Sequence, residues 1–246
     1  KILFKSEIVN IFEPILIPEN YVLKIERPIK INFFNQSFLK SLSPVYFKTM
    51  KDKIEINGHG KGNFFLVVSD KKSVIENTIF NNLGAPNENT FITGAVTFYK
   101  GIVLINNVKF INNTFGDDYL NIINSKIEIN NVSIENSYLD AIDVDFSSGK
   151  INSLKVKKSG NDGVDFSMSN ISLNDYVAFD ITDKAVSAGE KSSITVRDAK
   201  IVKAKFGFVS KDNSYLDIAH SSLEDTFAAF AAYNKKPEFG GAEIVV

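Results

Sequence analysis

The stretch Asp140-Ala-Ile-Asp-Val-Asp-Phe146 recurs in the chain as Asp162-Gly-Val-Asp-Phe-Ser-Met168, and the two first aspartates are 162 − 140 = 22 residues apart. Weaker copies at the same spacing keep an apolar residue at the third position, which is held by Leu120, Ile142, Val164, Val186, Phe208 and Phe230. A fixed period of this length is typical of a solenoid, in which each repeat buries its apolar face against its neighbours. If each repeat is one coil of stacked strands, residues one period apart lie about 4.8 Å from each other. The repeat therefore predicts columns of acidic side chains along the molecule.

Short runs in which Val or Ile alternates with polar residues occupy much of the chain, for example Lys126-Ile-Glu-Ile-Asn130 and Ser193-Ile-Thr-Val196. This alternation predicts strands with one buried face, and no segment keeps a helical apolar period for three turns. Asparagine pairs such as Asn112-Asn113 separate the runs, and asparagine suits turns because it tolerates left-handed backbone conformations. We therefore expect an all-β fold, a solenoid with 22 residues in each regular coil.

The chain is expected to form one continuous domain. Residues 1–55 are predicted to form an N-terminal cap and the first irregular coils, because prolines interrupt the short apolar runs there. Residues 56–246 are predicted to form the regular coils, with a surface insertion over Gly84-Ala-Pro-Asn-Glu-Asn-Thr90 and a last strand over Ala242-Glu-Ile-Val-Val246. A solenoid end without a cap exposes strand edges. We therefore expect additional domains, or an association partner, in the full-length protein.

The composition excludes several classes of function. The net charge of −1 gives no reason to expect nucleic-acid binding, and no apolar run is long enough to span a bilayer. The absence of cysteine excludes disulfide bonds, cysteine-ligated zinc and a thiol nucleophile. Tryptophan is also absent, so any stacking on sugar rings would depend on Tyr or Phe. The 21 phenylalanines are expected to fill a narrow interior.

The asparagine-rich strands, the coil length and the pattern Ile17-Pro-Glu-Asn-Tyr-Val-Leu-Lys-Ile25 resemble those of parallel β-helix proteins of the pectate-lyase-like superfamily. The resemblance covers essentially the whole chain, and it includes β-helix regions of bacterial surface proteins and polysaccharide-active proteins. It implies a single-stranded right-handed parallel β-helix with three short sheets. It also implies a bacterial protein that is extracellular, on the cell surface or periplasmic. Because one fold carries many functions, the site residues need their own argument.

Alternation along the strands assigns each side chain to the inside or the outside of the coil. The residues predicted to point inward are Ile142, Val144 and Phe146 in one copy and Val164, Phe166 and Met168 in the next. The residues between them then point outward, so that Asp143 lies on Asp165 and Asp145 lies on Ser167. The first of these columns continues with Asn121 and Ser187, and the second reaches Lys211.

A third column is expected at the turn before these strands, and it contains Asp118, Asp140, Asp162 and Lys184. The same face continues towards the C-terminus with Glu190, Asp212, Tyr233, Lys235 and Lys236. The three columns are therefore acidic in the middle and basic at one end. Carboxylates about 5 Å apart repel each other, so a proton, a cation or neighbouring lysines must compensate their charges.

Each kind of compensation predicts a different chemistry. A protonated and an ionised carboxylate side by side suit the acid and the nucleophile of a retaining glycosidase, which predicts catalytic roles for Asp143 and Asp165. A cation held by several carboxylates would be Ca²⁺, which prefers oxygen ligands. Asp162-Gly-Val-Asp165 resembles the Asp-Gly-hydrophobic-Asp segments of a pectate lyase family that combines Ca²⁺ with a lysine base. This resemblance implies that Ca²⁺ binds to Asp140, Asp143, Asp162 and Asp165, and that Lys184 or Lys211 is the base.

The sequence thus predicts a carbohydrate-active protein that binds a polysaccharide along residues 118–236 and cleaves or modifies it. The residues expected to contact this substrate are Asp118, Asn121, Asp145, Ser187, Glu190, Asp212, Tyr233 and Lys235. The reaction is left open between a lyase and a hydrolase, and Ca²⁺ is the one cofactor that the pattern suggests. The alternative is a non-catalytic β-helix, a spacer or a glycan-binding module of a larger surface protein. An enzyme would need shifted pKa values in the columns, whereas a spacer would pair every acid.

Overall fold

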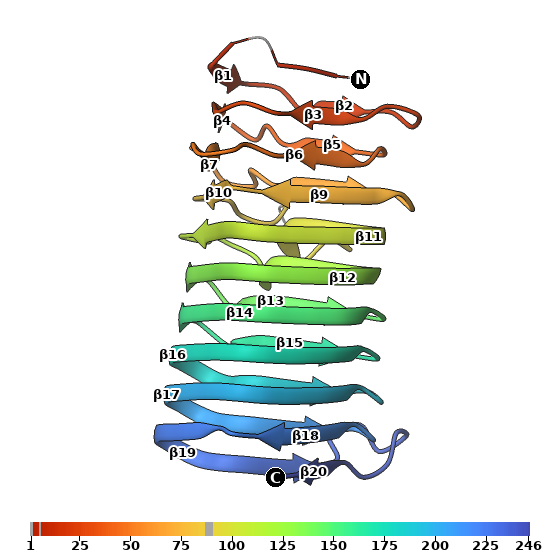
Figure 1. Ribbon diagram of the computed structural model, residues 1–246, viewed down its shortest axis with the longest axis vertical. Helices are drawn as coiled ribbons and strands as arrows, with labels where there is room; N and C mark the ends of the chain where they lie inside the picture. The colour runs from red at the N-terminus through yellow and green to blue at the C-terminus, as the bar shows by residue number, and fades with distance from the viewer. Residues whose placement is uncertain (1, 5, 87–90) are drawn as a thin grey trace.

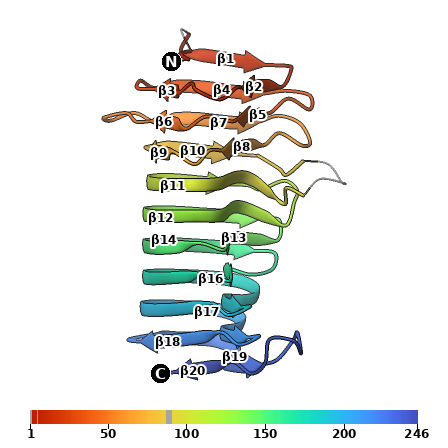
Figure 2. The same ribbon diagram turned by 90° about the vertical axis from the view of Figure 1, so that its right-hand side faces the viewer.

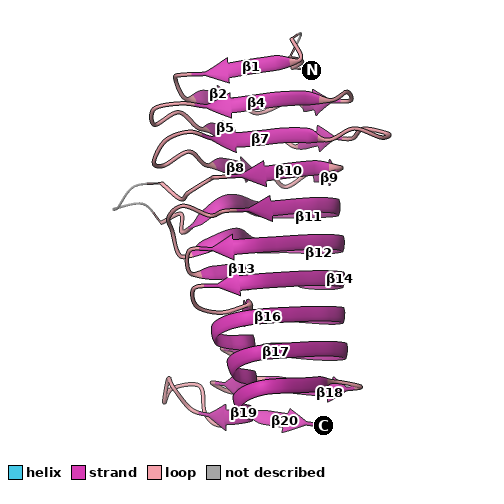
Figure 3. Ribbon diagram, turned by 90° about the vertical axis from the view of Figure 1, so that its left-hand side faces the viewer, coloured by secondary structure: helices cyan, strands magenta, loops and turns pink. Residues whose placement is uncertain are grey.

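The computed structural model, which describes residues 2–4, 6–86 and 91–246, is a stack of coils running from β1 (Ile8–Ile11) to β20 (Glu243–Val245) (Figure 1). The described residues form about 10 turns of a parallel β-solenoid. The winding is right-handed, the hand that connections between parallel strands nearly always adopt. Over the described residues the chain consists of strands and loops (Figure 3), and no helix is long and apolar enough to cross a membrane. The predicted all-β parallel β-helix is confirmed.

Each coil has three faces, and each face is a ladder of parallel strands. The first face contains β2 (Ile15–Ile17), β5 (Leu39–Ser41), β8 (Phe65–Val68), β13 (Asp140–Asp145) and β15 (Val164–Ser167). The second face contains β3 (Leu23–Ile25), β6 (Val45–Phe47), β9 (Lys72–Glu76), β18 (Tyr215–Ala219) and β20. The third face contains β1, β4 (Ile29–Phe33), β7 (Ile54–Gly58) and β10 (Thr78–Asn81).

The remaining strands run round corners of the coil and belong to more than one face. They are β11 (Gly94–Ile111), β12 (Asp118–Ser137), β14 (Ser148–Ser159), β16 (Asn170–Gly189), β17 (Ser193–Lys211) and β19 (Ser222–Tyr233). Because they continue through the corners, the described strands form one 20-stranded sheet instead of the three short sheets that we expected.

The register of the first face reproduces the sequence period. Asn121 pairs with Asp143, Asp143 with Asp165 and Asp165 with Ser187, a step of 22 residues each time. Earlier steps are longer, with 24 residues from Thr97 to Asn121 and 31 from Leu66 to Thr97. The longer coils carry the extra loops of the N-terminal part. Residues 87–90 of the expected insertion lie outside the described residues, and Gly84 at its start pairs with the next coil at Phe115.

Single residues with positive φ turn the corners of the coils. The corner between the first and the second face is occupied by Asn124, Phe146, Met168, Glu190 and Asp212, again 22 residues apart. Most other corners carry Asn or Asp, such as Asn131 and Asp175. These residues tolerate the left-handed conformation better than bulky ones do. The asparagine pattern of the sequence therefore marks the corners correctly.

The core is a narrow apolar column along the axis, as the phenylalanine content predicted. Phe33, Phe47, Phe65, Phe80, Phe98, Phe110, Phe166 and Phe208 are all fully buried. The rings of Phe80 and Phe110 stack across neighbouring coils with centroids 5.1 Å apart. Two buried tyrosines satisfy their hydroxyl groups on backbone oxygens, Tyr119 on Ile111 at 2.7 Å and Tyr176 on Ala185 at 2.8 Å. Stacked aromatic packing thus supplies much of the interior contact between coils.

Two residues expected inside the coil lie outside it. Phe146 is 57% exposed and Met168 is 41% exposed, whereas Ile142, Val144, Val164 and Phe166 are buried as predicted. The alternation fails because both residues occupy the left-handed corner, where the chain turns and the inward–outward pattern of a strand no longer applies. Phe230, predicted to fill the third position of the last copy, is also 42% exposed. It belongs to the end of the stack, where few further coils cover it.

Candidate functional site

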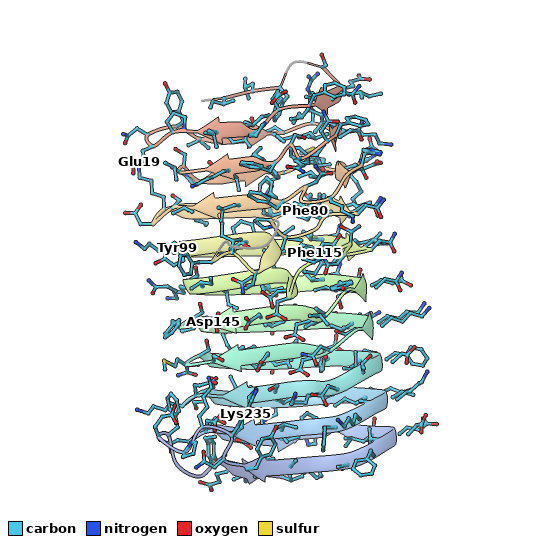
Figure 4. The ribbon with its side chains drawn as sticks, turned by 180° about the vertical axis from the view of Figure 1, so that it is seen from behind. Glu19, Phe80, Tyr99, Phe115, Asp145 and Lys235 are labelled. Carbon is cyan, nitrogen blue, oxygen red and sulfur yellow. The ribbon has the colours of Figure 1, made fainter. Side chains whose placement is uncertain are left out.

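The three predicted columns lie side by side on the first face. Asp143 pairs with Asp165, and Asp145 pairs with Ser167 in the same two coils. Figure 4 views this face directly and shows Asp145 between Tyr99, towards the N-terminus, and Lys235, towards the C-terminus. The register thus brings together side chains that the repeat placed in one column.

The column at the preceding turn is held together by hydrogen bonds between coils. The Oδ1 atom of Asp140 accepts the backbone N–H of Asp162 at 2.6 Å and the side-chain amide of Asn161 at 2.7 Å. Asp162 Oδ1 accepts the backbone N–H of Lys184 at 3.0 Å. Each aspartate therefore caps the same turn one coil further on, which explains why an acidic residue recurs at this position.

Lys184 ends this column as a fixed positive charge. Its Nζ lies 3.2 Å from Asp162 Oδ1, and it also forms an ion pair with the neighbouring Asp183. Burial alone would lower the pKa of Lys184, but the charges of Asp162 and Asp183 outweigh burial and raise it. A general base needs a lowered pKa. The environment of Lys184 is therefore the opposite of the one that the predicted base role requires.

The carboxyl groups in the columns are buried and raise each other's pKa values. For Asp140, burial and then the charge of Asp162 raise the pKa to about 8. Burial raises the pKa of Asp118 to about 7, and those of Asp145 and Asp162 to about 6. The pKa of Asp143 lies well above its usual range because of burial and the charges of Asp118, Asp145 and Asp165. Such shifts are characteristic of functional sites, and they meet the criterion set for an enzyme.

Lys211 reaches across a whole coil to the acidic columns. Its Nζ lies 3.5 Å from Asp165 Oδ2, and only 5% of the residue is exposed. The side chain crosses Gly189, where an added Cβ would lie 2.7 Å from the Lys211 Cε. Glycine at position 189 therefore opens the path along which the lysine reaches Asp165. The other oxygen of that carboxylate, Asp165 Oδ1, is buried and accepts no hydrogen bond within the described residues.

The C-terminal end of the face is covered by the loop between β19 and β20, which projects on the side of the first face (Figure 2). Glu190 accepts a hydrogen bond from Ser167 Oγ at 2.6 Å and pairs with Lys236 from this loop. Burial opposes ionisation of Glu190, but these partners and Lys211 lower its pKa. Asp212 accepts the backbone N–H groups of Lys235 at 2.7 Å and Lys236 at 2.6 Å. Asp212 therefore anchors the loop.

Several residues predicted to contact a substrate are too deeply buried to do so. Asp118, Asn121, Ser187 and Asp212 are at most 1% exposed. Coils pack so closely that an added Cβ on Gly94 would lie 2.6 Å from the Asn121 Cβ, which leaves no room for a ligand there. Asn121 instead donates to Asp118 Oδ2 at 3.0 Å and to Asp143 Oδ2 at 3.3 Å. The accessible part of the predicted set consists of Asp145, Tyr233 and Lys235, with Glu190 at its margin.

Carboxylate oxygens converge in two places in the columns. Asp140, Asp162 and Asp165 each offer one oxygen, and these atoms lie within 4.8 Å of one another. Asp143, the fourth predicted ligand, is not part of this group. Asp117, Asp118 and Asp140 form the second group. Sequence reasoning missed Asp117 as well as Asp183, although both stand directly beside a column residue, because neither lies in register with the repeat.

No protein-family model, curated protein or solved structure matches the chain. The resemblance to the pectate-lyase-like superfamily is therefore supported at the level of the parallel β-solenoid and not at the level of that family. What the site can do must be argued from its own geometry.

Proposed function

We propose that the protein is a carbohydrate-active β-helix that binds a polysaccharide along the first face and cleaves it with Asp143 and Asp165. The observation that carries this proposal is the unequal environment of these two stacked carboxyl groups. Asp143 is surrounded by the acids Asp118 and Asp145, which favour its protonated form. Asp165 lies 3.5 Å from the Lys211 ammonium group, which favours its carboxylate form. Two carboxyl groups with opposite protonation are the requirement for acid-assisted glycoside hydrolysis.

The spacing of the pair favours a retaining hydrolase. Adjacent parallel strands are about 4.8 Å apart, and retaining glycosidases hold their two carboxyl groups about 5–5.5 Å apart. In the proposed reaction Asp143 donates its proton to the glycosidic oxygen while Asp165 attacks the anomeric carbon and displaces the sugar. Water then attacks the glycosyl–Asp165 ester, and Asp143 takes the proton from that water. Lys211 holds the Asp165 carboxylate in position before attack.

The charge of the face favours a neutral polysaccharide. Six carboxyl groups, those of Asp118, Asp140, Asp143, Asp145, Asp162 and Asp165, meet only Lys184 and Lys211 within the columns. A polymer of uronic acids would bring further negative charge to this surface. Cleavage of a neutral polymer needs no additional cation. Because such polymers lie outside cells, this proposal is consistent with the expected extracellular or cell-surface location.

A second candidate is calcium-dependent binding of an acidic polysaccharide. The converging oxygens of Asp140, Asp162 and Asp165 suit a hard cation, and the unpartnered Asp165 Oδ1 leaves a free donor atom in that group. These residues fit Ca²⁺, which would neutralise the carboxylates and bridge them to the acidic groups of a substrate. Lys211 would then be the lysine nearest to the bound polymer.

The two candidates differ in substrate and in metal dependence. We would incubate the protein with laminarin, xylan and galactan as neutral polymers and with polygalacturonate as an acidic one, each with Ca²⁺ or with EDTA. Release of reducing ends from a neutral polymer in EDTA supports the hydrolase, and Asp143→Asn and Asp165→Asn should each lower this activity by about 10²–10⁴-fold. Asp198→Asn, an exposed corner residue on the other side of the coil, is the matched control.

The outcomes separate the candidates. Calcium-dependent formation of unsaturated products from polygalacturonate would favour the second candidate. Binding without cleavage by wild type would favour the non-catalytic glycan-binding alternative. No cleavage and no binding of any polymer would contradict both candidates and leave the columns as a structural feature.

A further inference from the structure

The corner beside the acidic columns carries two large apolar residues in an unfavourable backbone conformation. Phe146 has φ of 50° and Met168 has φ of 49°, and both are largely solvent-exposed. Among the described residues with positive φ they are the only apolar ones apart from glycine. Bulky side chains are disfavoured in this region because the Cβ approaches the following carbonyl oxygen.

Folding alone does not explain these two residues. Neighbouring coils use Asn124, Glu190 and Asp212 at the same corner, so the backbone itself accepts small or polar residues there. An exposed apolar side chain at this place also gains little from burial. Residues held in unfavourable conformations cluster at functional sites, where their position is needed for binding or catalysis.

Phe146 and Met168 lie at the two coils that carry the candidate catalytic pair. Phe146 directly follows Asp145, and Met168 directly follows Ser167, the two residues paired in the column beside Asp143 and Asp165. Their backbones continue the ladder, because the Phe146 N–H donates to the Ser167 carbonyl oxygen at 2.9 Å. The two side chains therefore start about 4.8 Å apart, one above the other.

Side chains from this corner reach the outer surface of the first face. Glu190 occupies the same corner one coil after Met168, and its Oε2 accepts the hydroxyl of Ser167 at 2.6 Å. Glu190 thus extends from the corner to the column that contains Asp145. Phe146 and Met168 start from equivalent positions, so they border the same surface as an apolar edge beside carboxyl groups.

We propose that Phe146 and Met168 form the platform on which a pyranose ring of a neutral polysaccharide stacks beside the candidate catalytic pair. This inference rests on the proposed function and specifies its substrate as a sugar with an apolar C–H face. Sugar sites combine such apolar surfaces with a few polar groups. The chain lacks tryptophan, and the flexible, polarisable thioether of Met168 complements the flat ring of Phe146.

The test uses substitutions that separate binding from stability. Phe146→Asn and Met168→Asn place a residue that tolerates the left-handed corner, so the melting temperature should stay equal or rise. The same variants should weaken binding of the neutral polymer that wild type cleaves by about tenfold each. Lys158→Asn is the matched control, because Lys158 is an exposed corner residue with φ of 60° on another edge of the coil. Phe146→Tyr keeps the ring and should retain wild-type affinity.

Affinity would be measured by calorimetry with oligosaccharides of that polymer, using Asp143→Asn as background to prevent turnover. Loss of affinity in Phe146→Asn, with full thermal stability and unchanged Lys158→Asn, supports the platform. Equal affinity of Phe146→Asn, Met168→Asn and the background protein overturns it while the proposed hydrolase stands. If the wild-type protein binds none of the neutral polymers, the proposed function and the platform both fall.

Discussion

Replacement of Asp140 by asparagine is expected to change how the stability of the protein depends on pH. Burial and the Asp162 charge raise the pKa of Asp140 to about 8 in the folded chain, whereas an aspartate in an unfolded chain titrates near pH 3.9. Between these two values the folded state holds a proton that the unfolded state has released. Stability therefore falls as the pH rises from about 4 towards 8, the reverse of the behaviour of a salt-bridged aspartate.

The magnitude follows from the size of this pKa difference. Each pH unit between the two pKa values costs about 1.4 kcal/mol, so Asp140 alone reduces the free energy of unfolding by on the order of 5 kcal/mol between pH 4 and 8. This is comparable to the whole stability of many domains. Asparagine keeps the oxygen that accepts the Asp162 N–H at 2.6 Å and the Asn161 amide at 2.7 Å. Asp140→Asn should consequently be close to wild type at pH 5 and clearly more stable at pH 8.

Thermal unfolding followed by circular dichroism from pH 4 to 9, in EDTA, measures this difference. The melting temperature of wild type should fall over the range more steeply than that of Asp140→Asn. Asp198→Asn, whose side chain is 68% exposed, should run parallel to wild type. Parallel curves for wild type and Asp140→Asn, or a wild-type stability that rises from pH 5 to 8, would refute the reasoning.

Three further predictions concern packing, the ion pair and calcium. Gly163→Ala places a Cβ 2.4 Å from the Tyr176 hydroxyl and 2.7 Å from the Ala185 carbonyl oxygen, so urea unfolding should show a loss of about 1–3 kcal/mol, and an unchanged midpoint would contradict the packing. Lys211→Met leaves the Asp165 carboxylate without its cation and should cost about 2 kcal/mol at pH 7, much of which Lys211→Met/Asp165→Asn should restore. A single variant as stable as wild type would show that the pair is unimportant. Ca²⁺ should raise the melting temperature at pH 8 more than at pH 5, because ligand carboxylates must be deprotonated, and equal shifts would count against a carboxylate site.

The period of the sequence was sufficient to predict which residues stack. Asp143 lies on Asp165, and Asp145 on Ser167, because a coil of constant length makes the strand register equal to the repeat. The burial of Ile142 and Val164 also follows, since strand alternation is a local property. Phe146 shows where this logic ends, because the same alternation places it inside and the corner turns it out.

What only the tertiary structure decided is the state of the acids and the identity of their partners. Lys211 pairs with Asp165 across Gly189, and Lys236 pairs with Glu190 across 46 residues of sequence. Such contacts depend on how far side chains and loops reach over the surface, which a one-dimensional repeat does not encode. Burial likewise turned Asp118 from an expected substrate contact into an interior group. The sequence by itself therefore determined the order of the columns, because strand register is periodic. The protonation and accessibility of those columns depend on desolvation and charge in three dimensions.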